Sequence, residues 1–242
     1  MQGRAAVFAL LVVGCAADDP ATSNADDELR DGAFTFERPE IGYMISNGMA
    51  LCTGTLVSPN VVLTAAHCVG YTTFDGAGAK QGTFTIERSA TEHHDFEYDA
   101  FVAFASAGAW GRDDVALLRL TSNVPPEVAT PAPIATETPR DGSHETVTLF
   151  GYGCSERPGI FGGAGQDDHT LHKQLRAFEI NPVRYVCPGD SGGPTVRADG
   201  SVFRVSSRMF TFEFLGFGMP DAFGDAVAHR DEIQAHISAW RR

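Results

Sequence analysis

Short apolar runs alternate with turn-forming residues along most of this chain, from Ile41 onward. Such runs, bounded by Gly, Pro, Asn and Asp, are typical of β-strands, and many of them without intervening helices predict an all-β sandwich or barrel. A Pro-rich crossing at 124–139 divides the runs into two sets. The expected strands include 54–57, 61–64, 82–87, 115–120, 146–151 and 202–206.

The C-terminal segment departs from this pattern. Ile233, Ile237 and Trp240 recur at i, i+4 and i+7, and therefore share one face of a helix. Asp231 precedes them and is a residue type that caps helices. We therefore expect one helix at the C-terminus.

The N-terminal segment also departs from the pattern of short strand-like runs. Arg4 is followed by an uncharged apolar run at 5–13, which is too short to span a bilayer but suits the core of a signal peptide. We expect a signal peptide over 1–15, and therefore export. Residues 16–30 are acidic and polar with hardly any large apolar side chain, which indicates a tether or propeptide.

Composition narrows the range of partners. With 242 residues and 43% hydrophobic content, the chain can bury one substantial core or two small ones. The formal net charge of −13, without any cluster of Lys and Arg, argues against a nucleic-acid partner.

Three motifs carry candidate chemistry. Gly189 to Pro194 reads GDSGGP, so Ser191 lies between glycines that let a substrate carbonyl approach main-chain N–H groups. His67 ends the run LTAAH, and Asp114 opens the run DVALLRL. A serine nucleophile, an imidazole base and a carboxylate that orients the imidazole make a complete acyl-transfer unit.

These segments closely resemble the signatures of the chymotrypsin/trypsin-like serine peptidases, and the resemblance extends from about Pro39 to the C-terminus. It implies two six-stranded antiparallel β-barrels, at about 31–123 and 135–242, with the C-terminal helix on the second barrel. We expect a bacterial-type member of the family. A core histidine, a loop cap or a hairpin could explain each motif alone, but their joint order makes coincidence a poor explanation.

The resemblance also implies the roles of the residues. Ser191 would attack a peptide carbonyl, His67 would accept its proton, and Asp114 would orient His67. The N–H groups of Gly189 and Ser191 would form the oxyanion hole. This mechanism needs no cofactor and no metal, and implies a monomer whose partner is a peptide or protein substrate.

Specificity and activation follow from the same resemblance. Tyr185, Ser207 and Met209 would line the pocket for the side chain before the scissile bond, and Tyr185 offers no carboxylate for Lys or Arg. In the family, a newly cut N-terminus pairs with the carboxylate that corresponds to Asp190. Leu29 is the nearest equivalent of that N-terminus here, although its sequence differs from the family pattern.

Two other classes of protein could carry these motifs. The sequence 189–193 also fits the nucleophile elbow of α/β-hydrolases, but that elbow leads into a helix. Here Pro194 opposes a helix and 195–212 reads as a strand pair. The second is a protease-like binding module locked in an inactive, zymogen-like state. Such modules usually replace a triad residue, whereas this chain keeps all three.

Five cysteines leave one unpaired in an exported protein. Cys15 follows Val-Val-Gly, which resembles the lipobox of bacterial lipoproteins, so we expect lipidation of Cys15 and an anchor at the cell envelope. The alternative is a plain secretory signal, cut near Ala16 or Ala17, which removes Cys15 and leaves the protein secreted. Membrane contact would arise only through that lipid.

The resemblance pairs Cys52 with Cys68. In many family members the cysteine before the serine motif pairs with a later cysteine, but none follows Cys187 here, which leaves Cys154 as its partner. Two histidine pairs, His93 with His94 and His169 with His172, lack the accompanying ligands of a metal site. We expect both pairs to lie in solvated loops.

Overall fold

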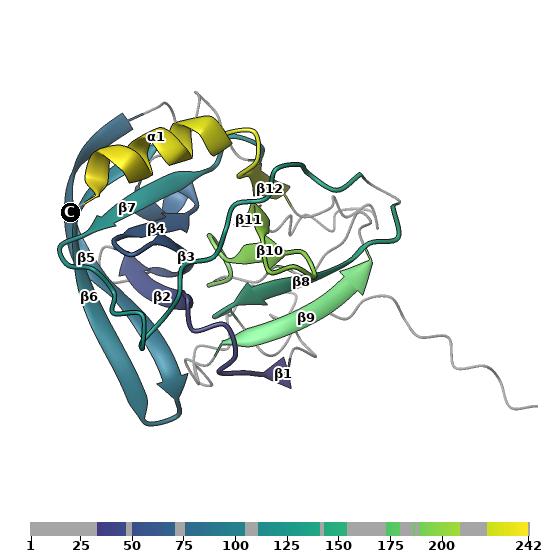
Figure 1. Cartoon of the computed structure of the whole chain (residues 1–242), viewed down its shortest axis with the longest axis horizontal. Helices are drawn as coiled ribbons and strands as arrows, with labels where there is room; N and C mark the ends of the chain where they lie inside the picture. The colour runs from purple at the N-terminus through teal and green to yellow at the C-terminus, as the bar shows by residue number, and fades with distance from the viewer. Residues whose placement is uncertain are drawn as a thin grey trace, which may run out of the picture.

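The computed structural model describes residues 33–46, 50–70, 76–104, 111–140, 143–153, 173–179, 186, 189–208 and 222–241. Within these ranges the chain is almost entirely β-structure, with a single α-helix at the C-terminal end (Figure 1). The elements are β1 (Ala33–Phe34), β2 (Ile41–Ser46), β3 (Ala50–Ser58), β4 (Val61–Thr64), the 3-10 helix η2 (Ala66–Val69), β5 (Gly76–Ser89), β6 (Glu92–Ala103), β7 (Ala116–Leu120), β8 (Thr146–Gly151), β9 (Gln174–Glu179), β10 (Pro194–Val196), β11 (Val202–Arg208), β12 (Ala222–Asp225) and α1 (Arg230–Trp240).

The first half forms a closed antiparallel barrel in the order β2-β3-β4-β7-β6-β5. Its interior buries an apolar cluster that includes Leu56, Val62, Phe84 and Leu118. Alternate residues of β4 belong to different clusters: Val62 joins the barrel interior, whereas its two neighbours pack outward against the second half. This explains why β4 reads as a continuous apolar run.

The second half forms a six-stranded sheet in the order β1-β9-β8-β10-β11-β12. The sequence predicted a second closed barrel, but the described strands form a sheet with β1 and β12 at its edges. β1 joins this sheet through the pairing of Ala33 with Leu175. The boundary predicted from the sequence, 31–123, counts this segment with the first barrel, because a two-residue strand gives no signal of its partner.

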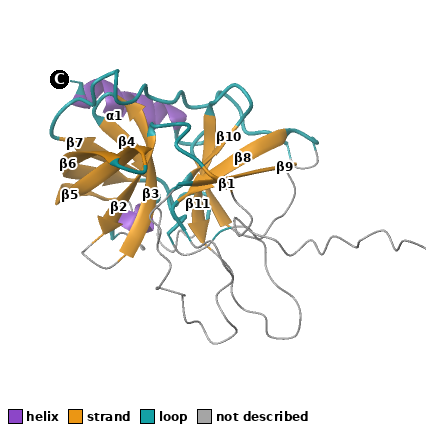
Figure 2. Ribbon diagram, turned by 90° about the horizontal axis from the view of Figure 1, so that it is seen from below, coloured by secondary structure: helices purple, strands orange, loops and turns teal. Residues whose placement is uncertain are grey.

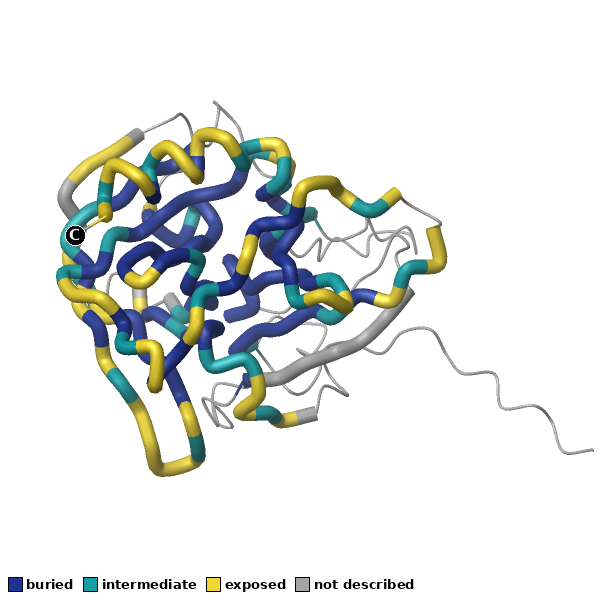
Figure 3. The backbone as a smooth tube through the Cα atoms, viewed as in Figure 1, coloured by how far each residue is buried: buried dark blue, intermediate teal, exposed yellow. Residues whose placement is uncertain are grey.

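A shared apolar cluster joins the two halves. It includes Ile41, Leu63 and Leu117 from the first barrel and Phe150 and Val205 from the second sheet. The two bodies lie side by side in Figure 2, and the strands that meet between them are largely buried in Figure 3. His67, Asp114 and Ser191 lie where these two bodies meet.

The C-terminal helix is confirmed, with Ile233 and Ile237 buried on its inner face. The resemblance predicted packing on the second barrel alone, whereas Ile233 and Ile237 belong to the apolar cluster that the two halves share. The Asn60 amide donates to the Trp240 carbonyl at 2.6 Å, and α1 lies along β7 of the first barrel (Figure 1). The helix begins at Arg230, so Asp231 lies in its first turn and does not cap it.

The predicted strands match β4 and β8 and fall within or overlap β3, β5, β7 and β11, which confirms the all-β class. The loop expected around His93 and His94 is instead part of β6, which pairs with β5 in a long hairpin. Its polar side chains face solvent on both sides near the tip, which hid the strand from the apolar pattern. Among the described residues, no helix has the length and apolar character needed to cross a membrane.

Candidate active site

His67 and Asp114 are brought together from separate strand ends of the first barrel. His67 lies in η2 directly after β4, and Asp114 lies two residues before β7. The Asp114 carboxylate is fully buried and accepts both the His67 N–H (2.9 Å) and the ring Nδ1–H (2.7 Å). Because the carboxylate accepts at Nδ1, the neutral ring carries its lone pair at Nε2. Nε2 is then the nitrogen available to accept a proton.

Ser207 donates a hydrogen bond from Oγ to Asp114 Oδ2 at 2.5 Å and accepts the Gly111 N–H at 3.1 Å. Its hydroxyl therefore faces the carboxylate, although the sequence assigned Ser207 to the substrate pocket. A carboxylate that accepts three donors is held in one orientation. Sequence reasoning missed this contact because the two residues are 93 positions apart.

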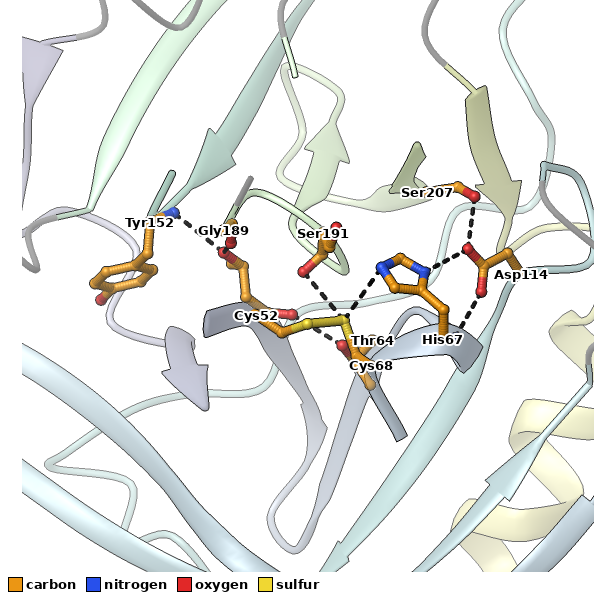
Figure 4. The surroundings of a disulfide bond; sticks show 10 residues. Cys52, Thr64, His67, Cys68, Asp114, Tyr152, Gly189, Ser191 and Ser207 are labelled. Carbon is orange, nitrogen blue, oxygen red and sulfur yellow. Dashed lines mark hydrogen bonds and ion pairs between the residues drawn. A yellow bond between two sulfur atoms is a disulfide. The ribbon is translucent and has the colours of Figure 1, made fainter. Parts of the chain in front are cut away.

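A disulfide joins Cys52 of β3 to Cys68 of η2 beside the histidine. Cys68 Sγ lies 3.8 Å from His67 Nε2 and 3.6 Å from the Ser191 carbonyl oxygen. In Figure 4 the His67 ring lies between Ser191 and Asp114. The two sulfurs and His67 are close enough to ligate a metal, but sulfurs joined in a disulfide offer no thiolate.

The loop 189–193 presents two main-chain donors beside Ser191. Gly189 has a φ of +105°, which favours glycine, and the Gly193 N–H closes the turn on the Asp190 carbonyl at 2.8 Å. Neither the Gly189 nor the Ser191 N–H donates to another described residue. Two main-chain N–H groups of one loop that bond to no described residue can bind a developing oxyanion.

The Asp190 side chain is buried against the strand end at 151–153. Its Oδ1 accepts the Gly153 N–H at 2.8 Å. A Cβ at Gly151 or Gly153 would overlap the Asp190 carboxylate, so these glycines make room for it. The sequence pattern GYG contained this signal, but nothing in it identified Asp190 as the neighbour.

The N-terminal segment is anchored close to this strand. Lys173 is fully buried, and its ammonium donates to the carbonyls of Glu37 (3.1 Å) and Arg38 (2.6 Å). Burial lowers the Lys173 pKa to about 8, against the opposing effect of nearby carboxylates such as Glu40. For Tyr152, whose charged form is an anion, burial raises the pKa instead, and the negative charge of Glu87 raises it further.

Several predicted site residues lie outside the described residues. They are Tyr185 and Met209 of the predicted pocket, Leu29, Cys15, the pair Cys154–Cys187, and the histidines His169 and His172.

Comparison with known proteins defines the class. The trypsin family model matches residues 37–209, and the chain belongs to this family. Trypsin epsilon of Drosophila erecta is 26% identical over 194 residues, which cover 66% of this chain and 68% of that protein. Human granzyme M is 28% identical over 206 residues, which cover 72% of this chain and 74% of the relative.

Solved structures agree on the fold. The structure of neuropsin, a serine protease expressed in the limbic system of mouse brain, superposes with a TM-score of 0.61 at 17% identity, over 85% of this chain and 97% of neuropsin. The family and the chymotrypsin-like fold are therefore as the sequence predicted. The relatives named here are animal proteins, so the bacterial-type assignment stays a prediction.

Proposed function

We propose that this chain hydrolyses peptide bonds with Ser191 as nucleophile, His67 as general base and Asp114 as the group that orients His67. Membership of the trypsin family and the relatives' identities support serine-type endopeptidase activity. The observation that carries the residue roles is the Asp114–His67 pair beside a loop in which two main-chain N–H groups donate to no residue that the structure describes.

In the proposed reaction, the Ser191 hydroxyl oxygen bonds to the peptide carbonyl carbon while its proton passes to His67 Nε2. The N–H groups of Gly189 and Ser191 stabilise the oxygen that becomes negative. His67 then gives the proton to the leaving amine, and an acyl-enzyme remains. Water, deprotonated by His67, releases the acid and restores Ser191.

Labelling with a fluorophosphonate and turnover of a peptide library test this proposal. Wild type should be labelled at Ser191 and should cleave peptides. Ser191→Ala should lose labelling and nearly all turnover, leaving at most the ~10³–10⁴-fold residual acceleration of binding and oxyanion hole alone. Wild type that is folded and processed but inert in both assays would favour the inactive binding-module alternative.

We further propose a preference for an uncharged residue before the scissile bond. Its support is the resemblance that puts Tyr185 at the pocket floor, where a buried Lys or Arg would lack a carboxylate partner. The library would contradict this preference if cleavage after Arg were faster than after Ala, Val or Leu.

Activation by a cut before Leu29 is also proposed. Ala33 is held in β1 by its pairing with Leu175. Four extended residues span roughly 14 Å, so a new N-terminus at Leu29 could lie no farther than that from Ala33. Asp190 is a buried carboxylate that such an ammonium could pair with. An uncut chain as active as one trimmed to Leu29 would contradict this proposal.

Export, followed by lipidation of Cys15, is proposed from the apolar run and the lipobox-like sequence alone. Mass analysis of the mature chain from a bacterial host tests it. A lipid-modified Cys15 supports the proposal, and an unmodified start after Cys15 contradicts it.

A further inference from the structure

Thr53 of the first barrel contacts the loop of the second half that carries Ser191. It follows Cys52 in β3 and is fully buried. Its main-chain N–H donates to the Ser191 carbonyl at 2.7 Å, and its Oγ1 donates to the Gly189 carbonyl at 2.8 Å. The same Oγ1 accepts the Tyr152 N–H at 3.1 Å.

One residue thus holds the carbonyls on both sides of Asp190. The peptide unit between those two is held by the turn bond from Gly193 to the Asp190 carbonyl. Gly189 can adopt more backbone conformations than any other residue type, so its orientation depends on an external anchor. The only side-chain anchor among the described residues is the Thr53 hydroxyl.

We infer that Thr53 is a positioning residue for the oxyanion hole. It does not touch substrate; it acts by holding Gly189 and Ser191 so that their N–H groups point to one place before the substrate arrives. Donors that are already oriented need no reorganisation during the reaction, which is the basis of their effect on rate. This inference rests on the proposed function of the loop.

Thr55 offers a matched comparison on the same strand. It is also fully buried, and because it comes two residues after Thr53 in the strand, its side chain lies on the same face of β3. Its hydroxyl, however, has no hydrogen-bond partner in the described part of the chain. Replacing each threonine by valine removes a hydroxyl of equal burial, and only one of the two removals breaks contacts with the loop.

The experiment compares Thr53→Val, Thr53→Ser and Thr55→Val with wild type in steady-state cleavage of one peptide. Thr53→Val should lower kcat about 10- to 100-fold with KM nearly unchanged, a smaller effect than the ~10²–10³-fold cost of deleting an oxyanion donor. Thr53→Ser keeps the hydroxyl and should restore most of kcat, and Thr55→Val should match wild type. A peptide boronate, which resembles the tetrahedral intermediate, should lose affinity for Thr53→Val in parallel with kcat.

Three results would overturn the inference: wild-type kcat in Thr53→Val, an equal loss in Thr55→Val, or no rescue by Thr53→Ser. Wild type without turnover would instead contradict the proposed function. Hydrogen–deuterium exchange of peptides covering 189–193 then tests the brace by itself. Faster exchange in Thr53→Val than in Thr55→Val supports it, and equal exchange contradicts it.

Discussion

Glycine at 192 is required by its surroundings as well as by its backbone angles. Its φ is +81°, and a Cβ there would overlap Thr64 Oγ1 and the Thr53 carbonyl oxygen. Gly200 has nearly the same φ, +82°, but a Cβ there would meet only the end of the Arg38 side chain at 3.3 Å. The two positions therefore separate backbone strain from crowding.

We predict that Gly200→Ala lowers the free energy of unfolding by about 1–2 kcal/mol, the cost of the left-handed conformation. Gly192→Ala should cost clearly more and should abolish most activity, because the loop beside Ser191 must move to admit the methyl group. Urea denaturation in a Ser191→Ala background, which avoids self-digestion, measures the stability of both. Equal destabilisation by the two variants would show that crowding at 192 is relieved without cost.

At the scale of elements, the Cys52–Cys68 disulfide ties β3 to η2, the helix that carries His67. The two cysteines are 16 positions apart. η2 has only four residues and no side-chain cap, so its own hydrogen bonds contribute little to holding His67. The disulfide and the hydrogen bonds between His67 and Asp114 therefore hold His67 in position.

Replacing both cysteines by serine should lower the free energy of unfolding by about 3 kcal/mol, the value expected for a loop of this length. We also expect lower kcat, since Cys68 Sγ contacts both His67 and Ser191. Urea denaturation and peptide cleavage measure the two effects. Unchanged stability would mean that the unfolded chain is compact without the link.

At the scale of the whole molecule, the N-terminal segment crosses from the second sheet to the first barrel. β1 pairs with β9, and β2 begins the barrel seven residues later. Lys173 holds the carbonyls between them, although its burial lowers its pKa from 10.5 to about 8. A buried ammonium at this junction makes stability depend on pH.

The direction of this pH dependence is set by which state, folded or unfolded, binds more protons. Between about pH 8 and pH 10.5 the unfolded chain binds a proton at Lys173 that the folded chain has released, so this group makes stability rise with pH. Below pH 8 both states are protonated and the contribution is constant. We predict that wild type gains about 2 kcal/mol relative to Lys173→Met from about pH 8 to about pH 9.5.

Urea denaturation across this range, again in the Ser191→Ala background, gives the difference between the two proteins. A difference that does not change with pH would show that the Lys173 pKa is ordinary. Any pH-independent cost of Lys173→Met reports the loss of the hydrogen bonds to the Glu37 and Arg38 carbonyls, of which the Arg38 carbonyl still accepts the Ile41 N–H.

Local patterns in the sequence determined the all-β class, the C-terminal helix and the three motifs that point to acyl transfer. β4 and β8 were predictable because their apolar runs are bounded by turns. The polar tip of β6 and the two-residue β1 were not, because a strand without an apolar face is defined only by its partner.

Tertiary structure alone decided which side chains support the site. Ser207 bonds to Asp114 across 93 positions and Thr53 to Gly189 across 136, and no local pattern encodes such partners. It also decided that α1 lies along β7 with Ile233 and Ile237 in the cluster shared by both halves, since an apolar helix face does not specify which apolar surface covers it. The physical reason is the same throughout: periodicity fixes local geometry and the buried face, whereas a hydrogen-bond partner depends on where the rest of the chain passes.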